Sequence, residues 1–234
     1  MHWAADNDLA PLRKWRLIKT SRRRDAKTDW RRPAEIETIL SAMTKKETRA
    51  LAALYVGCGL RASEGIWIDS REFSPALTSL RVLGTARPAS AALGHAGTKS
   101  GKDRSVKIPP RAAELLRPVI WTEPGFALRS SRGDPWRGRD ALDKTLRAAC
   151  RRAGVEPLGA HARHTFATWH NAVHGDPIRL MAAGGWSSLS LVERYAHAAD
   201  EELAGEVIAG GWAILGQSDE RYNDIPIKYR VLAA

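Results

Sequence analysis

The sequence predicts an α+β protein that is mainly α-helical with a small antiparallel β-sheet. Two observations predict this class. Apolar residues recur at helical spacing over most of the chain, whereas the stretch from Gly65 to Pro109 holds short β-rich pieces separated by Gly, Pro and Ser. The chain has 234 residues, 44% of them hydrophobic, and can bury one substantial core, or one core plus a small appendage.

Two packed helices are expected first. One begins at Pro33, and the other contains the apolar run from Leu51 to Val56, which stops at Gly57 and Gly59. The apolar positions of the first helix are Ile36, Ile39, Leu40 and Met43.

Three pieces typical of strands follow these helices: Ile66 to Ile68, Leu80 to Val82 and Val106 to Ile108. They predict a small sheet edged by a hairpin, whose turn is Ser100-Gly101. Further helices are expected over residues 110–120, 139–153, 160–174, 176–183, 188–197 and 199–214.

The net charge of +11 indicates a polyanionic partner, and its distribution strengthens that interpretation. Residues 13–32 carry +8 and residues 33–198 carry +9, whereas the first 12 residues carry −2 and the last 36 carry −4. For residues 13–32 a solvated linker is the alternative. There is no run of 18 apolar residues and no signal-peptide layout, so we expect a soluble, cytoplasmic protein with no membrane partner, and Cys58 and Cys150 as reduced core thiols.

Arg61 is the first candidate for phosphate binding. It follows the break at Gly59, so we expect it at a helix-to-helix turn with its guanidinium directed into a cleft. A guanidinium fork matches two phosphate oxygens. The alternative is that Arg61 merely pairs with Glu64, three residues further on.

Lys99 and Lys102 flank the predicted turn. A lysine there can reach into a DNA groove, or protonate an oxygen as it leaves phosphorus. Exposed hairpins often carry lysines without such a role, so this motif is weak by itself.

Arg163 shares a predicted helix face with Ala160 and Ala167, which leaves a long cation room to extend into a cleft. His170 and His174 have the spacing of a zinc-chelating pair. Ordinary helix histidines are favoured over such a site.

Tyr195 is the candidate nucleophile. A phenol has a pKa of about 10, so at neutral pH it attacks only if a base removes its proton or nearby cations stabilise the phenolate. On the short amphipathic helix expected here, a core or rim tyrosine is the alternative.

Taken together and in order, these motifs resemble the catalytic domain of the tyrosine recombinases, the phage integrase family. The resemblance covers residues 33–200. Its motifs are Gly59-Leu60-Arg61-Ala62-Ser63-Glu64, Thr98-Lys99-Ser100-Gly101-Lys102-Asp103-Arg104, Arg163-His164-Thr165-Phe166-Ala167-Thr168, Gly184-Gly185-Trp186 and Glu193-Arg194-Tyr195-Ala196-His197. Trp186 lies nine residues before Tyr195, at a position that is His or Trp in the family.

The resemblance implies the tyrosine recombinase catalytic-domain fold and DNA cleavage and rejoining through a 3′-phosphotyrosine, without a metal or nucleotide cofactor. Tyr195 would attack the phosphodiester, and Arg61 and Arg163 would clamp its non-bridging oxygens. Lys99 would protonate the departing 5′-oxygen, and Trp186 would donate its indole N–H to the phosphate.

One position departs from the family pattern. A histidine usually stands three residues before the second arginine and is a candidate acceptor of the tyrosine proton, but here that residue is Ala160. Three interpretations stay open: another group or water takes the proton, His161 swings in from a frayed helix start, or activity has been lost. We favour the first.

The resemblance also implies a domain layout and partners. We expect residues 1–32 to be a basic linker, and one interpretation is that they include the end of a missing upstream DNA-binding domain. Residues 33–200 should be the catalytic domain. Residues 201–234 should form a C-terminal helix and tail. That tail docks on a neighbouring protomer or packs on its own body. The expected partners are double-stranded DNA and three further copies in a tetramer on paired sites, in a bacterial or phage-encoded mobile element.

Three functions are therefore compared: a site-specific recombinase or integrase, a catalytically impaired DNA-binding relative, and a relaxing enzyme that resembles type IB topoisomerases.

Overall fold

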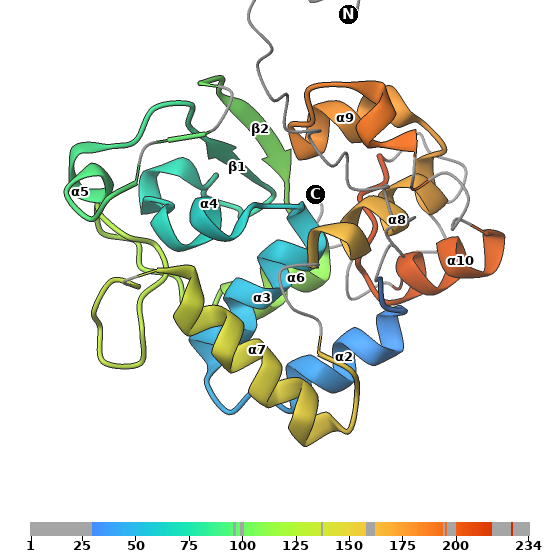
Figure 1. The fold of residues 1–234 in the computed structure, drawn as a ribbon, viewed down its shortest axis with the longest axis horizontal. Coiled ribbons are helices and arrows are strands. Elements are labelled where there is room, and N and C mark those ends of the chain that lie inside the picture. The colour runs from blue at the N-terminus through green and yellow to red at the C-terminus, as the bar shows by residue number, and fades with distance from the viewer. Residues whose placement is uncertain are drawn as a thin grey trace, which may run out of the picture.

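The computed structural model describes residues 30–95, 97–98, 101–136, 138–157, 162–193, 195, 200–216 and 226. Figure 1 shows a helical protein with one small sheet, as the sequence predicts. In chain order the elements are α2 (Pro33–Ser41), α3 (Lys46–Cys58), α4 (Ala62–Trp67), η1 (Ser70–Glu72), β1 (Ser79–Val82), α5 (Pro88–Ala91), β2 (Arg104–Lys107), α6 (Pro110–Leu116), α7 (Arg139–Ala153), α8 (Ala162–His174), α9 (Pro177–Gly184), η3 (Leu189–Leu191) and α10 (Glu201–Ala209).

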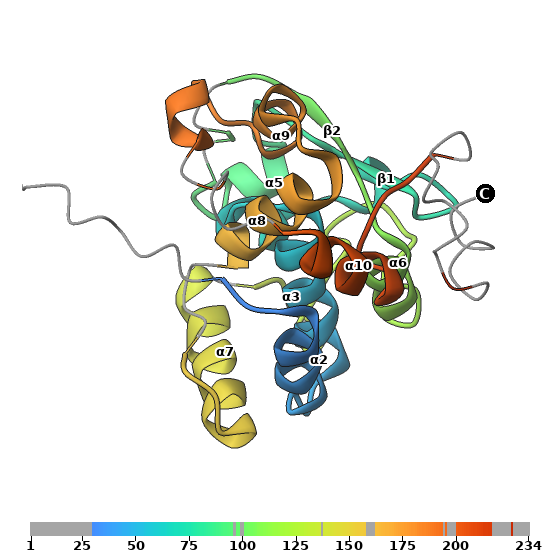
Figure 2. The same cartoon turned by 90° about the vertical axis from the view of Figure 1, so that its right-hand side faces the viewer.

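Helix α3 forms the centre of the core. Every residue from Ala50 to Cys58 is buried, so this helix is enclosed on all sides, and it packs on α6 and α8. Figure 2 shows α2 and α7 at one end of the molecule and α9 with the two strands at the other. Cys58 and Cys150 are both buried in this core, which confirms their prediction as core thiols.

The sheet is two-stranded and antiparallel, with Leu80 opposite Val106. The two strands pair as predicted, but residues 83–103, which include α5, connect them, so a turn at Ser100-Gly101 is not the whole connection. Ser100 lies outside the described residues. Gly101 donates its N–H to the carbonyl of Thr98 at 3.0 Å.

The strand expected over Ile66 to Ile68 was also wrong, because α4 occupies most of it. Glu64 reaches back to the backbone N–H of Arg61 at 2.7 Å, and this bond stabilises the first turn of a helix. Ile66 is buried as a helical residue instead of alternating along a strand.

The C-terminal helices are shorter than expected. Over 188–197 the described residues form no α-helix, only the 3₁₀ turn η3 and further 3₁₀ conformation at Glu193 and Tyr195. The helix expected over 199–214 ends as α10 at Ala209, because Gly210 and Gly211 follow and Gly211 has a φ of 71°. The apolar face of α10 packs on α8 of the same chain.

The residues just before α2 are fixed to the C-terminal helices. The Arg31 backbone N–H donates to the Thr165 hydroxyl at 3.2 Å, and its carbonyl accepts from the Trp169 indole at 3.0 Å. Arg32 pairs with Glu206 at 2.5 Å. Residues 31 and 32, expected to be linker, thus belong to the folded body.

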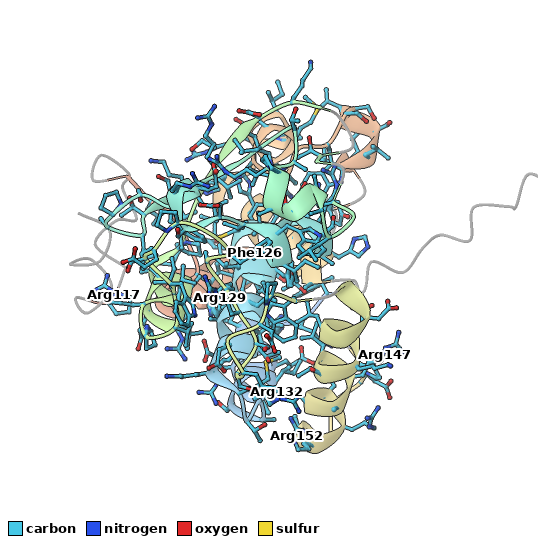
Figure 3. All side chains as sticks on the ribbon, turned by 90° about the vertical axis from the view of Figure 1, so that its left-hand side faces the viewer. Arg117, Phe126, Arg129, Arg132, Arg147 and Arg152 are labelled. Atoms are coloured by element: carbon cyan, nitrogen blue, oxygen red, sulfur yellow. The ribbon has the colours of Figure 1, made fainter. Side chains whose placement is uncertain are left out.

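Helix α7 presents a basic stripe to solvent, formed by Lys144, Arg147 and Arg151. These side chains are exposed at i, i+3 and i+7, and none of them forms an ion pair with another described residue. Arg147 lies on the outer side of α7 in Figure 3. Arg152, labelled in the same view, instead donates to the carbonyl of Ala42 at the end of α2, at 2.8 and 3.0 Å.

None of the helices in the described part of the chain combines the length and apolarity needed to cross a membrane.

Candidate active site

Arg61 is placed by the junction between α3 and α4, as the sequence predicts. Gly59 ends α3 in the left-handed conformation, with φ of 62°. A Cβ at this position would lie 2.3 Å from the Phe166 ring, so both the backbone conformation and the space require glycine. The chain then turns at Leu60, and Arg61 becomes the N-cap residue of α4.

Arg61 binds Glu64, which was the alternative considered for it, but it also reaches a second element. One terminal nitrogen lies 2.8 Å from a Glu64 oxygen, and the other donates to the carbonyl of Gly185 at 3.0 Å. The ion pair therefore orients the guanidinium toward the end of α9 and leaves other N–H groups of the fork for a ligand.

Glu64 is shared between two arginines. Its side chain is 2% exposed, and both of its oxygens accept hydrogen bonds from Arg104 of β2, at 3.0 and 2.7 Å. Burial raises the pKa of Glu64, but the hydrogen bonds and charge of Arg104, together with those of Arg61, outweigh burial, so the pKa lies below its ordinary value. Glu64 is therefore a carboxylate that neutralises one of the two cations.

Arg163 enters the same region from the first turns of α8. Its guanidinium donates to the carbonyl of Gly59 at 3.2 Å and to that of Gly184, and it lies 4.0 Å from the ring centre of Trp186. Burial, followed by the charge of Arg61, lowers the pKa of Arg163 to about 10. Arg163 thus remains a cation at neutral pH, held where an anionic ligand would stabilise it.

The end of α9 joins the two candidate phosphate-binding arginines. Gly185 has a φ of 67° and ends the helix, and the successive carbonyls of Gly184 and Gly185 accept from Arg163 and Arg61 respectively. Carbonyls at a helix C-terminus lack helical partners and carry partial negative charge, so they suit cationic donors. Adjacent peptide groups therefore hold two guanidiniums that come from different parts of the chain.

Tyr195 lies beside these groups in a small apolar cluster separate from the main core. The cluster contains Phe166, Ala167, Leu180, Val192 and Tyr195, with Trp186 packed against it. Tyr195 is 2% exposed, and its ring centre lies 5.9 Å from that of Trp186. Its hydroxyl oxygen is 2.5 Å from Nδ1 of His164, the residue after Arg163.

The structure therefore brings together Arg61, Arg163, Trp186 and Tyr195 of the five predicted site residues. Lys99 lies outside the described residues, and so do Ala160 and His161. Among the residues that are described, no group of three His, Cys, Asp or Glu side chains is arranged to hold a metal ion.

Sequence reasoning gave no role to Arg104 or to the His164–Tyr195 contact. Arg104 lies two residues before buried Val106 on the same face of β2, so a charged residue at an inward strand position was the available signal. His164 offered no comparable signal, because adjacency to Arg163 does not reveal which side chain it meets.

The sequence profile of the phage integrase family matches residues 30–202. This chain belongs to the phage integrase family. Its members are tyrosine recombinases, and the matched range agrees closely with the extent of the resemblance drawn from the motifs.

Individual relatives agree with this membership. The integrase of Salmonella phage P22 is 25% identical over 215 residues, which cover 86% of this chain and 51% of the relative. Tyrosine recombinase XerC of Rhodospirillum centenum is 29% identical over 163 residues, 66% of this chain and 43% of the relative. The chain thus spans about half the length of the curated relatives it matches.

The fold is likewise that of a tyrosine recombinase catalytic domain. XerH site-specific recombinase, solved as a pre-cleavage complex with its difH substrate, superposes with a TM-score of 0.55 at 22% identity, over 74% of this chain and 51% of that one.

Proposed function

We propose that this chain is the catalytic part of a site-specific DNA recombinase or integrase that cleaves and rejoins strands through a 3′-phosphotyrosine at Tyr195. The observation that carries the proposal is the convergence of Arg61 and Arg163 on adjacent carbonyls of α9, beside Trp186 and the Tyr195 hydroxyl. Family membership supports the same chemistry.

The reaction uses each group in a defined way. Arg61 and Arg163 bind the non-bridging oxygens and offset charge that develops at phosphorus. Tyr195 attacks phosphorus, its bond to the 3′-phosphate forms as the bond to the 5′-oxygen breaks, and Lys99 supplies a proton to that oxygen. Trp186 donates its indole N–H to the phosphate and packs the nucleophile segment. The phosphotyrosine conserves the bond energy, so rejoining by a 5′-hydroxyl needs no nucleotide cofactor.

DNA is the proposed partner, and the relative XerH was solved on a DNA substrate. The α7 stripe supplies exposed cations for phosphates outside the cleavage site. We further propose assembly as a tetramer on paired sites, with residues after Gly216 as the segment that contacts a neighbouring protomer.

A catalytically impaired DNA-binding relative is the second candidate, and Ala160 favours it because a methyl group cannot accept a proton. A pool of nicked duplexes with randomised sequence separates the two functions, since a nick near the cleavage point lets the short leaving strand diffuse away and traps the covalent intermediate. Protein–DNA adducts that survive denaturation, and that Tyr195→Phe abolishes, support the recombinase.

Sequence-selective capture under native conditions without any adduct supports the binding relative. If the protein neither forms covalent adducts nor binds duplexes selectively under native conditions, both functions are overturned. Where adducts form, sequencing of the trapped strands supplies the duplex used in the experiments below.

A further inference from the structure

The hydroxyl of Tyr195 has a defined partner in the folded protein. His164 Nδ1 lies 2.5 Å from the phenolic oxygen, and the two rings are tilted by 42° with centres 5.5 Å apart. The residues are separated by 31 positions, so tertiary packing of α8 against the segment after η3 creates the contact. This distance is that of a short, direct hydrogen bond.

The contact matters because a phenol with a pKa of about 10 is a poor nucleophile until its proton is removed. A neutral imidazole that carries its proton on Nε2 can accept at Nδ1. In the family pattern the candidate acceptor is a histidine at position 160, where this chain has alanine, and His164 brings a group of the required chemistry to the reacting atom.

Two other described groups suit the task less well. Glu64 is bound by Arg61 and Arg104, which hold its pKa below the ordinary value and make it a weak base. His170, further along α8, packs against Phe166 and His174 with ring centres 5.5 and 4.6 Å away. Burial, followed by the charge of His174, lowers the pKa of His170 to about 3.

We propose that His164 is a catalytic residue whose Nδ1 accepts the proton of Tyr195 as the phenolic oxygen attacks phosphorus. The inference rests on the proposed function and names the base for it. As the proton passes to Nδ1, the bond from Tyr195 to phosphorus forms and the bond to the 5′-oxygen breaks, with that oxygen protonated by Lys99. In rejoining, a 5′-hydroxyl attacks phosphorus and gives its proton back to Lys99, the tyrosine oxygen leaves, and His164 returns a proton to it.

The test compares single-turnover adduct formation by the full chain and its variants on the duplex recovered above. His164→Ala should slow adduct formation by about 10²- to 10⁴-fold, the usual contribution of a general base, with unchanged duplex affinity. Free imidazole should restore part of the rate to His164→Ala and none to Tyr195→Phe. His161→Ala is the matched control and should react at the wild-type rate.

His164→Asn separates proton transfer from positioning. An asparagine oxygen can accept the phenolic hydrogen bond but cannot take up the proton, so this variant should stay slow while its melting temperature stays near that of the wild type. Three results would each overturn the proposal. They are a wild-type rate in His164→Asn, failure of imidazole to restore the rate of His164→Ala, and a loss of rate in His161→Ala equal to that in His164→Ala.

A second measurement tests the contact without catalysis. The ¹³Cζ resonance of Tyr195, assigned by its loss in Tyr195→Phe, should move when His164 is replaced and stay in place in His161→Ala. An unmoved resonance overturns the inference even in a protein that forms adducts. Absence of wild-type adducts on every duplex overturns the proposed function, and the inference falls with it.

Discussion

Arg104 donates a hydrogen bond from each of its terminal nitrogens to Glu64, at 3.0 and 2.7 Å from the two carboxylate oxygens. The pair is almost enclosed, with side-chain exposures of 11% and 2%. Because Glu64 also holds Arg61, the strand residue Arg104 fixes the position of a predicted phosphate ligand through a shared carboxylate. Arg104 is thus a positioning residue for Arg61.

Arg104→Ala should lower the free energy of unfolding by about 3 kcal/mol, because removing one partner of a buried ion pair leaves the other charge poorly compensated. Urea unfolding measures this loss. Arg81→Ala on the neighbouring strand is the control: Arg81 and Asp103 pair at 2.8 Å but are 65% and 45% exposed, so its loss should be under about 1 kcal/mol. Equal losses in the two variants would contradict a structural role for the buried pair.

Glu64 should also contribute to acid unfolding. Its pKa is lowered in the folded protein, so the folded state binds fewer protons than the unfolded state. The stabilisation is therefore complete above the unfolded pKa of about 4.3, and it is lost as the pH falls toward the folded pKa. Urea titrations at successive pH values measure the free energy of unfolding. In this pH window the free energy of unfolding of Glu64→Gln should depend less steeply on pH than that of the wild type, by at most about 1.4 kcal/mol per pH unit.

Glu114→Gln serves as the control for the loss of stability at acidic pH. The Glu114 carboxylate is 47% exposed and pairs with Arg111, so this variant should change the free energy of unfolding at neutral pH by under about 1 kcal/mol. A Glu64→Gln protein with an unchanged loss of stability at acidic pH would show that the carboxylate is not held ionised by the two arginines.

Sequence patterns predicted the helical framework well because the apolar face of α2 and the continuous apolar run of α3 are both local features of the sequence. They failed at Ile66 to Ile68, where β-branched residues favour a strand but the Arg61–Glu64 contact begins a helix. The antiparallel pairing of the two strands was expected correctly, but the helix α5 in the connection between them was not.

In the candidate site, too, local features were predicted from the sequence and contacts between distant residues were not. Ordered motifs indicated Arg61, Arg163, Trp186 and Tyr195 as a set, since each motif is local. Contacts such as Arg104 with Glu64, 40 residues apart, and His164 with Tyr195 depend on how elements pack, which spacing along one element cannot specify.

Gly59 and Gly154 offer a matched comparison at two helix ends. Both are left-handed C-cap residues, with φ of 62° for Gly59 and 67° for Gly154. A Cβ on Gly59 would lie 2.3 Å from the Phe166 ring, whereas a Cβ on Gly154 would have no atom within 4 Å. Gly154→Ala should cost about 1 kcal/mol of unfolding free energy from backbone strain alone. Gly59→Ala should cost about 3 kcal/mol, since overpacking adds to the same strain.

Gly59→Ala has a second expected effect, because the Gly59 carbonyl accepts from Arg163 at 3.2 Å. Adduct formation on the nicked duplex should fall in Gly59→Ala at temperatures where the variant is still folded, and should be unchanged in Gly154→Ala. Similar unfolding free energies for the two variants, measured by urea titration, would contradict the predicted clash with Phe166.

The α7 stripe should contribute to DNA affinity through charge alone. Arg147→Ala removes one exposed cation and should reduce the slope of log affinity against log salt by about 1, with the loss similar for all duplex sequences. Fluorescence anisotropy with a labelled random-sequence duplex at several salt concentrations measures both effects. Arg152→Ala is the control from the same helix: its guanidinium is bound to the Ala42 carbonyl, so its loss should affect the unfolding free energy more than the salt slope. If Arg147→Ala leaves the slope unchanged, α7 faces away from the bound DNA, and the net charge of the central body acts through other elements.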